Sequence, residues 1–101
     1  MLASKPSAGL ATIADVPRIS VFYGIVIEMY FGDHPPPHFH ARYGGDAAKI
    51  EIASGEIIAG TLPGRALRLV REWMELHGDE LEANWRRVVG HERPLTIDPL
   101  P

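Results

Sequence analysis

The stretch HFHARYGGDAAKIEIA, residues 38–53, contains two alternating segments separated by a pair of glycines. Gly44-Gly45 is a strong signal for a two-residue turn, because glycine readily adopts the positive φ angles that tight hairpin turns require. The sequence therefore predicts an antiparallel hairpin. Its register places the following residues opposite one another: Tyr43 and Asp46, His40 and Lys49, His38 and Glu51.

Side chains alternate between the two faces of a strand, so this register gives the hairpin one apolar and one polar face. The apolar face carries Phe39, Ala41, Tyr43, Ala48, Ile50 and Ile52. The polar face carries His38, His40, Arg42, Lys49 and Glu51. Residues 25–31 alternate in the same way, and matching their apolar side chains to the apolar face places Glu28 and Tyr30 beside the histidines.

Further strands and two helices are expected around the hairpin. Residues 19–22 precede a turn at Gly24, and residues 56–59 follow a turn at Gly55. Beyond Pro63, apolar residues recur at spacings of three and four, which indicates amphipathic helices. Strands followed by helices are typical of an α+β fold. The sequence predicts an antiparallel sheet of four or five strands, with two C-terminal helices packed on one face.

Glycines and acidic residues set the expected limits of these two helices. Gly78 suits the end of the first helix, because helices commonly end on a glycine in the left-handed conformation. Asp79 and Glu82 have the spacing of a capping box, which predicts that a second helix begins there. Gly90 is the expected end of this second helix.

Composition limits the class of protein. The chain has 101 residues, which favours a single domain, expected over residues 18–98 after a disordered N-terminal extension, residues 1–17. The net charge of −3 gives no overall basic field for nucleic acid, although a local RNA site stays open. The absence of cysteine excludes disulfides and thiolate metal sites, and no apolar run reaches the ~18–20 residues of a membrane span. We therefore expect a cytoplasmic protein with no membrane segment.

Three of the five histidines lie within residues 34–40, and three consecutive prolines follow the first of them. His38 and His40 point to the same side of a strand about 7 Å apart, a spacing that suits two ligands of one divalent metal ion. Glu28 or Glu51 is the expected third ligand. His34 would join only if the loop folds back, because an extended proline run carries it roughly 12 Å from His38.

The same residues support a second interpretation. Histidine titrates near neutral pH, and a neighbouring carboxylate holds its tautomer, so His38, His40 and Glu28 could act as general acids and bases. With Arg42 or Lys49 holding a phosphate, they would form a metal-independent ribonuclease. A third interpretation is a solvated polar face with ordinary histidine–glutamate pairs.

Several short motifs together resemble the bacterial domain-of-unknown-function family 4160, over about residues 17–98. The Pro-Pro-His-Phe-His segment is the most distinctive of them. The family's usual loop reads His-x-Pro-Pro-His, and Pro35 occupies the x position here. The residues that carry the likeness are Phe22-Tyr23-Gly24-Ile25, Met29-Tyr30, Asp33-His34, Pro36-Pro37-His38-Phe39-His40, Tyr43-Gly44-Gly45, Ser54-Gly55-Glu56, Leu62-Pro63, Arg65-Ala66-Leu67, Val70-Arg71-Glu72-Trp73 and Asn84-Trp85.

The resemblance implies a small cytoplasmic bacterial protein, with no catalytic residues to carry over. It also implies a neighbouring gene for another small protein, in an arrangement similar to toxin–antitoxin pairs. The leading functional hypothesis is therefore a protein-interaction module that binds that neighbour through an exposed edge strand, residues 19–22 or 56–59. A ribonuclease-type toxin and a divalent-metal-binding protein are the alternatives.

Overall fold

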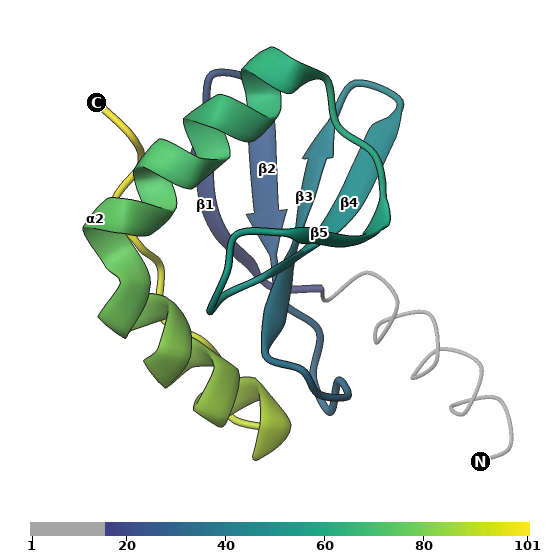
Figure 1. Ribbon diagram of the computed structural model, residues 1–101. Helices are drawn as coiled ribbons and strands as arrows, with labels where there is room; N and C mark the ends of the chain where they lie inside the picture. The colour runs from purple at the N-terminus through teal and green to yellow at the C-terminus, as the bar shows by residue number, and fades with distance from the viewer. Residues whose placement is uncertain (1–15) are drawn as a thin grey trace, which may run out of the picture.

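An antiparallel sheet forms one layer of the molecule, and its five strands lie in the same order in the sheet as in the sequence (Figure 1). The computed structural model describes residues 16–101. The expected N-terminal extension, residues 1–17, falls outside this range except for its last two residues. The strands are β1 (Arg18–Phe22), β2 (Ile25–Glu28), β3 (His38–Tyr43), β4 (Asp46–Glu51) and β5 (Ile57–Gly60).

The central hairpin, β3 and β4, has the register predicted from the glycine pair. His40 lies opposite Lys49, and His38 lies opposite Glu51. Gly44 has a φ angle of 60°, which favours glycine at this position. On the other side of β3, Glu28 of β2 lies opposite His40, so the expected neighbourhood of Glu28 and the histidines is also confirmed at the level of the backbone.

The two C-terminal helices expected from the sequence are not separate, because both segments belong to one helix, α2 (Gly64–Val89). This helix is kinked at His77, where the backbone is not helical (φ −132°, ψ 25°). The kink lies one residue before Gly78, the expected end of the first helix. The apolar stripe continues across the kink, since Trp73 before it and Leu81 after it are both fully buried, so both parts of the helix pack on the same core.

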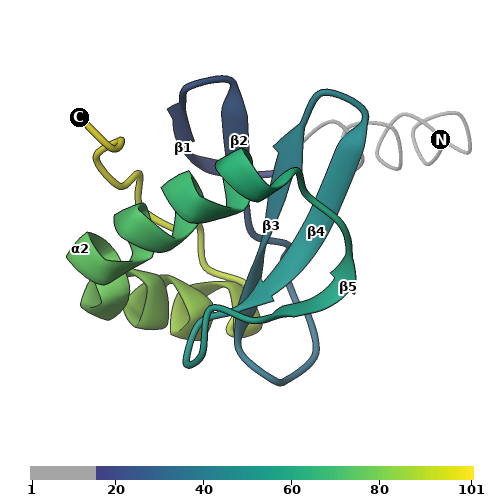
Figure 2. The same cartoon turned by 45° about the horizontal axis from the view of Figure 1, so that its top comes forward.

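The hydrophobic core lies between α2 and one face of the sheet (Figure 2). Trp73 is at its centre, with ring centroids 5.3 Å from Phe22 and 5.9 Å from Phe39. The opposite face of the sheet carries the exposed side chains of Arg42 and Lys49. None of the helical structure described for residues 16–101 is long and apolar enough to cross a lipid bilayer.

The C-terminal segment, residues 91–101, ties the helix to the first strand. The Ile97 N–H group donates a hydrogen bond of 2.7 Å to the Ile19 carbonyl oxygen at the edge of β1. Asn84 of α2 binds the same segment twice: its Nδ2 donates to the Leu95 carbonyl oxygen (2.8 Å), and its Oδ1 accepts from the Leu95 N–H (2.9 Å). The buried Asn84 side chain therefore makes the two backbone hydrogen bonds that a neighbouring strand would otherwise make with Leu95.

Replacing Asn84 tests this attachment. Asn84→Ala leaves the Leu95 N–H and carbonyl groups without these partners, so we expect the free energy of unfolding to fall by about 2 kcal/mol. Urea denaturation measures the loss. Arg86→Ala, at an exposed position of the same helix, is the control and should change little. Equal losses in both variants would contradict the role given to Asn84.

Candidate metal centre

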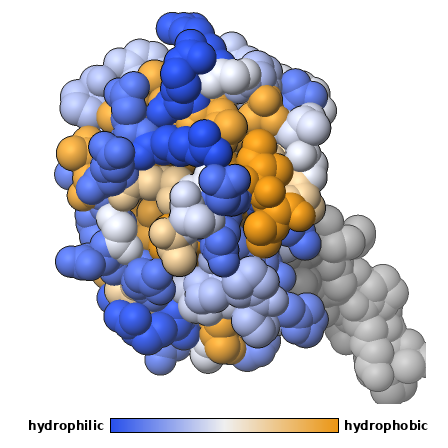
Figure 3. Space-filling view, in the orientation of Figure 1, coloured by the Kyte–Doolittle hydropathy of each residue, from blue (hydrophilic) through white to orange (hydrophobic). Residues whose placement is uncertain are grey.

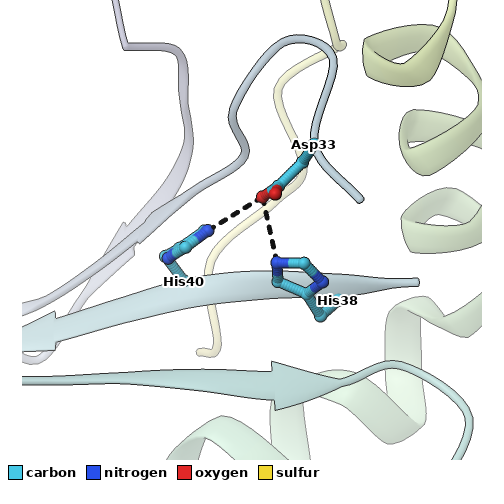
Figure 4. Close-up of side chains that lie close together, drawn as sticks. All are labelled: Asp33, His38 and His40. Carbon is cyan, nitrogen blue, oxygen red and sulfur yellow. Dashed lines mark hydrogen bonds and ion pairs between the residues drawn. The ribbon is translucent and has the colours of Figure 1, made fainter. Parts of the chain in front are cut away.

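Three side chains from two neighbouring segments converge at one end of the sheet: Asp33, His38 and His40 (Figure 4). The two histidines lie one residue apart on β3 and therefore point to the same face. Asp33 comes from the loop between β2 and β3 and lies over them. Its Oδ2 atom is 2.9 Å from His38 Nε2 and 3.1 Å from His40 Nε2. All three potential ligand atoms lie within 4.8 Å of one another.

His38 is held in one tautomer. Its Nδ1 atom lies 2.7 Å from the Pro36 carbonyl oxygen, which can only accept a hydrogen bond, so the Nδ1 atom carries the proton. In the neutral ring, Nε2 then presents a lone pair. This atom is buried and has no hydrogen-bond partner among the described residues. Asp33 Oδ2 is 2.9 Å away, but this contact does not have the geometry of a hydrogen bond. Two electron-rich atoms face each other here, and a proton or a cation between them would relieve the repulsion.

His40 is held on two sides. Its ring stacks on Tyr30 with a centroid distance of 3.9 Å and an interplanar angle of 6°, and its Nε2 atom pairs with Asp33 Oδ2. Burial lowers the pKa of His40 below its ordinary value of 6.5, and this effect exceeds the opposing effect of the hydrogen bond with Asp33. The neutral imidazole therefore predominates at pH 7, and its Nε2 atom donates to Asp33 because a carboxylate only accepts. A metal ion bound at Nε2 would replace this proton.

Asp33 is ionised in the same pH range. Its partial burial acts to raise the pKa, but the hydrogen bond with His40, the backbone hydrogen bond from His34 and the two neighbouring imidazoles together lower it below 3.8. The His34 N–H group donates to Asp33 Oδ1 at 2.9 Å. This bond leaves Oδ2 as the atom that faces both histidines. A backbone donor of this kind orients a ligating carboxylate in many metal sites.

The loop that carries Asp33 is attached to the end of α2. The Gly32 N–H group donates a hydrogen bond of 2.8 Å to the Val88 carbonyl oxygen. Gly32 has a φ angle of 66°, and a Cβ atom at this position would lie 2.8 Å from Cε1 of the His91 ring. Trp85 of α2 packs against the His38 ring at a centroid distance of 5.3 Å. The last turns of the helix thus position both the loop and one of the histidines.

The other residues proposed from the sequence lie outside this group. The Glu28 carboxylate accepts two hydrogen bonds from the Arg42 guanidinium, at 3.1 Å and 2.9 Å. Glu51 accepts a hydrogen bond from the Ser54 hydroxyl group at 2.5 Å. His34 is exposed, and its backbone, rather than its ring, contacts Asp33. Whether any of these side chains acts in catalysis stays a prediction.

Sequence reasoning missed Asp33 as a member of the group. The signal was present, because a carboxylate stands immediately before the His-Pro-Pro-Pro-His segment. An extended proline run, as expected for His34, would carry Asp33 away from His38 as well. The loop instead folds back over β3, as the 2.9 Å contact between Asp33 and His38 shows.

A substitution at Gly32 tests the link between the helix end and the site. Gly32→Ala introduces a side chain at a positive φ angle and against the His91 ring, so we expect a loss of about 1–2 kcal/mol in the free energy of unfolding. The displaced loop should also change the imidazole NMR resonances of His38 and His40.

Two other glycines provide matched controls. Gly45→Ala meets no neighbouring atom within 4 Å and should leave both measurements unchanged. Gly44→Ala has a positive φ angle without a neighbour, so it should lower the stability while leaving the histidine resonances in place. Unchanged histidine resonances in Gly32→Ala would contradict the role of Gly32 in placing Asp33.

The comparisons with known proteins agree with the likeness in the motifs. The family model described as "Domain of unknown function (DUF4160)" matches residues 24–86, which include β2 to β5 and most of α2. No curated protein and no solved structure matches the chain. The matched segment also contains Asp33, His38 and His40, and it covers more than half of the sequence. The chain belongs to the DUF4160 family.

Proposed function

We propose that this domain binds a divalent transition-metal ion of the zinc type through Asp33, His38 and His40. The observation that carries the proposal is the Nε2 atom of His38. It is buried, it lacks a hydrogen-bond partner among the described residues, and it faces the Oδ2 atom of an ionised carboxylate. A metal ion between the two atoms would satisfy both, with the lone pair of the neutral His38 ring as one of its ligands.

The distances within the group support a shared ion. Zinc binds histidine nitrogen and carboxylate oxygen at ~2.0–2.2 Å, so two ligand atoms of one tetrahedral ion lie about 3.3–3.6 Å apart. The two contacts of Asp33 Oδ2, at 2.9 Å and 3.1 Å, are slightly shorter than this, so the side chains would have to move apart a little to share an ion. Two imidazoles with one carboxylate suit zinc, and also ferrous iron.

The number of ligands indicates the kind of site. Structural zinc sites have four protein ligands, whereas sites that act on a bound molecule keep one position open. Only three ligand groups converge in the described residues. Asp33 and His40 are partly accessible, whereas the His38 side chain is only 3% exposed, so an open position would lie on the side of Asp33 and His40. The centre would therefore be suited to binding a further ligand.

The acid–base interpretation uses some of the same atoms. A metal-independent ribonuclease built on His38, His40 and Glu28 needs a free carboxylate beside the imidazoles, and the Glu28 carboxylate is engaged by Arg42. The paired Asp33 would have to replace it. Neither arrangement supplies a partner for the lone pair of His38 Nε2 while the ring is neutral. A metal ion accounts for that atom, and we therefore favour the metal centre.

Titration with Co²⁺ or Zn²⁺ tests the proposal. We expect one equivalent to bind, with shifts confined to the imidazole resonances of His38 and His40. Asp33→Asn and His40→Gln should weaken binding at least about tenfold. His34→Gln changes the exposed neighbour of Asp33 and keeps the backbone hydrogen bond, so it should bind normally. Affinity should fall as the pH is lowered, because protons compete for the imidazoles.

Two outcomes would contradict the metal centre. One is equal and weak shifts at His77 and His91, which would mean adventitious binding. The other is unchanged affinity in both Asp33→Asn and His40→Gln, provided that both variants keep the circular dichroism spectrum of the parent protein.

A second candidate function is the binding of a small protein, encoded by a neighbouring gene, through strand addition at β5. The edge of β1 is occupied where Ile97 donates to Ile19, whereas β5 pairs with no strand other than β4 among residues 16–101. Figure 3 shows hydrophobic surface in the region where β5 lies in Figure 1, and the Ile58 side chain is 42% exposed. An edge strand with exposed apolar side chains is a common site for a partner strand.

Co-expression with the neighbouring gene product tests this candidate. We expect the two proteins to co-purify, and Ile58→Glu to abolish the complex by placing a charge at the edge. Val21→Glu is the matched control, since Val21 is 50% exposed on β1 and far along the sheet order from β5. Failure of the unmodified proteins to co-purify at micromolar concentration would contradict the interaction.

A further inference from the structure

A hollow of about 220 Å³ lies beside His40 on the part of the sheet formed by β3, β4 and β5. Small residues create it, because Ala47, Ala59 and Gly60 leave space between longer side chains. Gly60 cannot be enlarged, since a Cβ atom there would lie 2.1 Å from the Ala47 carbonyl oxygen. The residues that line the hollow are His40, Ala47, Ala48, Lys49, Ala59 and Gly60.

Lys49 gives this hollow a positive charge. It lies directly opposite His40 in the β3–β4 register, so the Cβ atoms of the two residues are about 4.5–5.5 Å apart. Lys49 is exposed and makes no ion pair with any of residues 16–101.

The neighbouring carboxylates are already engaged. Glu28 is bound by Arg42, Glu51 by Ser54, and Asp33 by the histidines. The Lys49 ammonium group is thus left available for an anion from outside the described chain. It lies beside His40, one of the proposed metal ligands, which lines the same hollow.

We propose that this hollow binds the oxyanion group of a small molecule, a carboxylate or a phosphate, between the Lys49 ammonium group and a metal ion bound at His40. The inference rests on the proposed metal centre and specifies the class of its further ligand. Tyr30 covers one face of the His40 ring, and His40 lines the hollow, although Asp33 and His38 do not. A ligand in the hollow would therefore reach the ion beside His40, from the side of β4. A divalent ion and an ammonium group together favour an anion over a neutral molecule.

Titration of the Co²⁺-loaded protein with sodium phosphate and, separately, sodium acetate tests the inference. Binding should change the visible spectrum of the cobalt ion, and the stronger of the two anions identifies the preferred oxyanion. Lys49→Met should weaken anion binding about tenfold or more, because it removes a charge-assisted hydrogen bond. Lys49→Arg should keep most of the binding.

Two further variants distinguish the hollow from a general charge effect. Arg65→Met removes one positive charge from an exposed position on α2 and should bind anions normally. Ala59→Leu places a larger side chain in the hollow and should weaken anion binding while leaving the Co²⁺ affinity unchanged.

The outcomes separate this inference from the metal centre. If Co²⁺ binds in one equivalent but neither anion changes its spectrum, the inference is overturned and the metal centre stands. Equal anion affinity in Lys49→Met and the parent protein would also overturn it. If Co²⁺ does not bind, the metal centre fails, and with it the inferred bridging of the anion between metal and Lys49.

Discussion

The alternation of side chains along β3 is the constraint on which both layers of the molecule depend. Phe39 points into the core and contacts Trp73, while His38 and His40 on either side of it point to the other face. Because the period of a strand is two residues, a shift of one residue in register would turn the histidines toward the core around Trp73 and turn Phe39 away from it. The same pairing that closes the core therefore sets the spacing of the two imidazoles.

The site also depends on the far end of the chain. The loop carrying Asp33 is attached to the last turn of α2 through Gly32 and Val88, and Trp85 of the same helix packs against His38. The helix in turn is held to the sheet by Trp73 and by the C-terminal segment that Asn84 binds. A change in helix packing would consequently reach the carboxylate, although the helix supplies no member of the group itself.

The charged side chains on the sheet face that carries the histidines are arranged in local pairs. Glu28 and Arg42 neutralise each other, and Asp33 faces two imidazoles of which His40 has a lowered pKa because it is buried. A bound divalent ion would therefore leave the centre with a net positive charge beside Lys49. This pattern links the proposed metal centre to the proposed oxyanion site without requiring any rearrangement of the sheet.

The sequence by itself determined the elements whose pattern depends on near neighbours. The glycine pair and the alternation of residues 38–53 gave the hairpin register and placed His38 and His40 on one face, and the structure has both. Only the tertiary structure decided that Asp33 joins them, that Glu28 pairs with Arg42, and that the two expected helices join in one kinked helix. These outcomes depend on contacts between distant residues, such as Gly32 with Val88 and the burial of Trp73 and Leu81 in one core. Local patterns carry no information about such contacts, because their free energy arises only when the chain is packed.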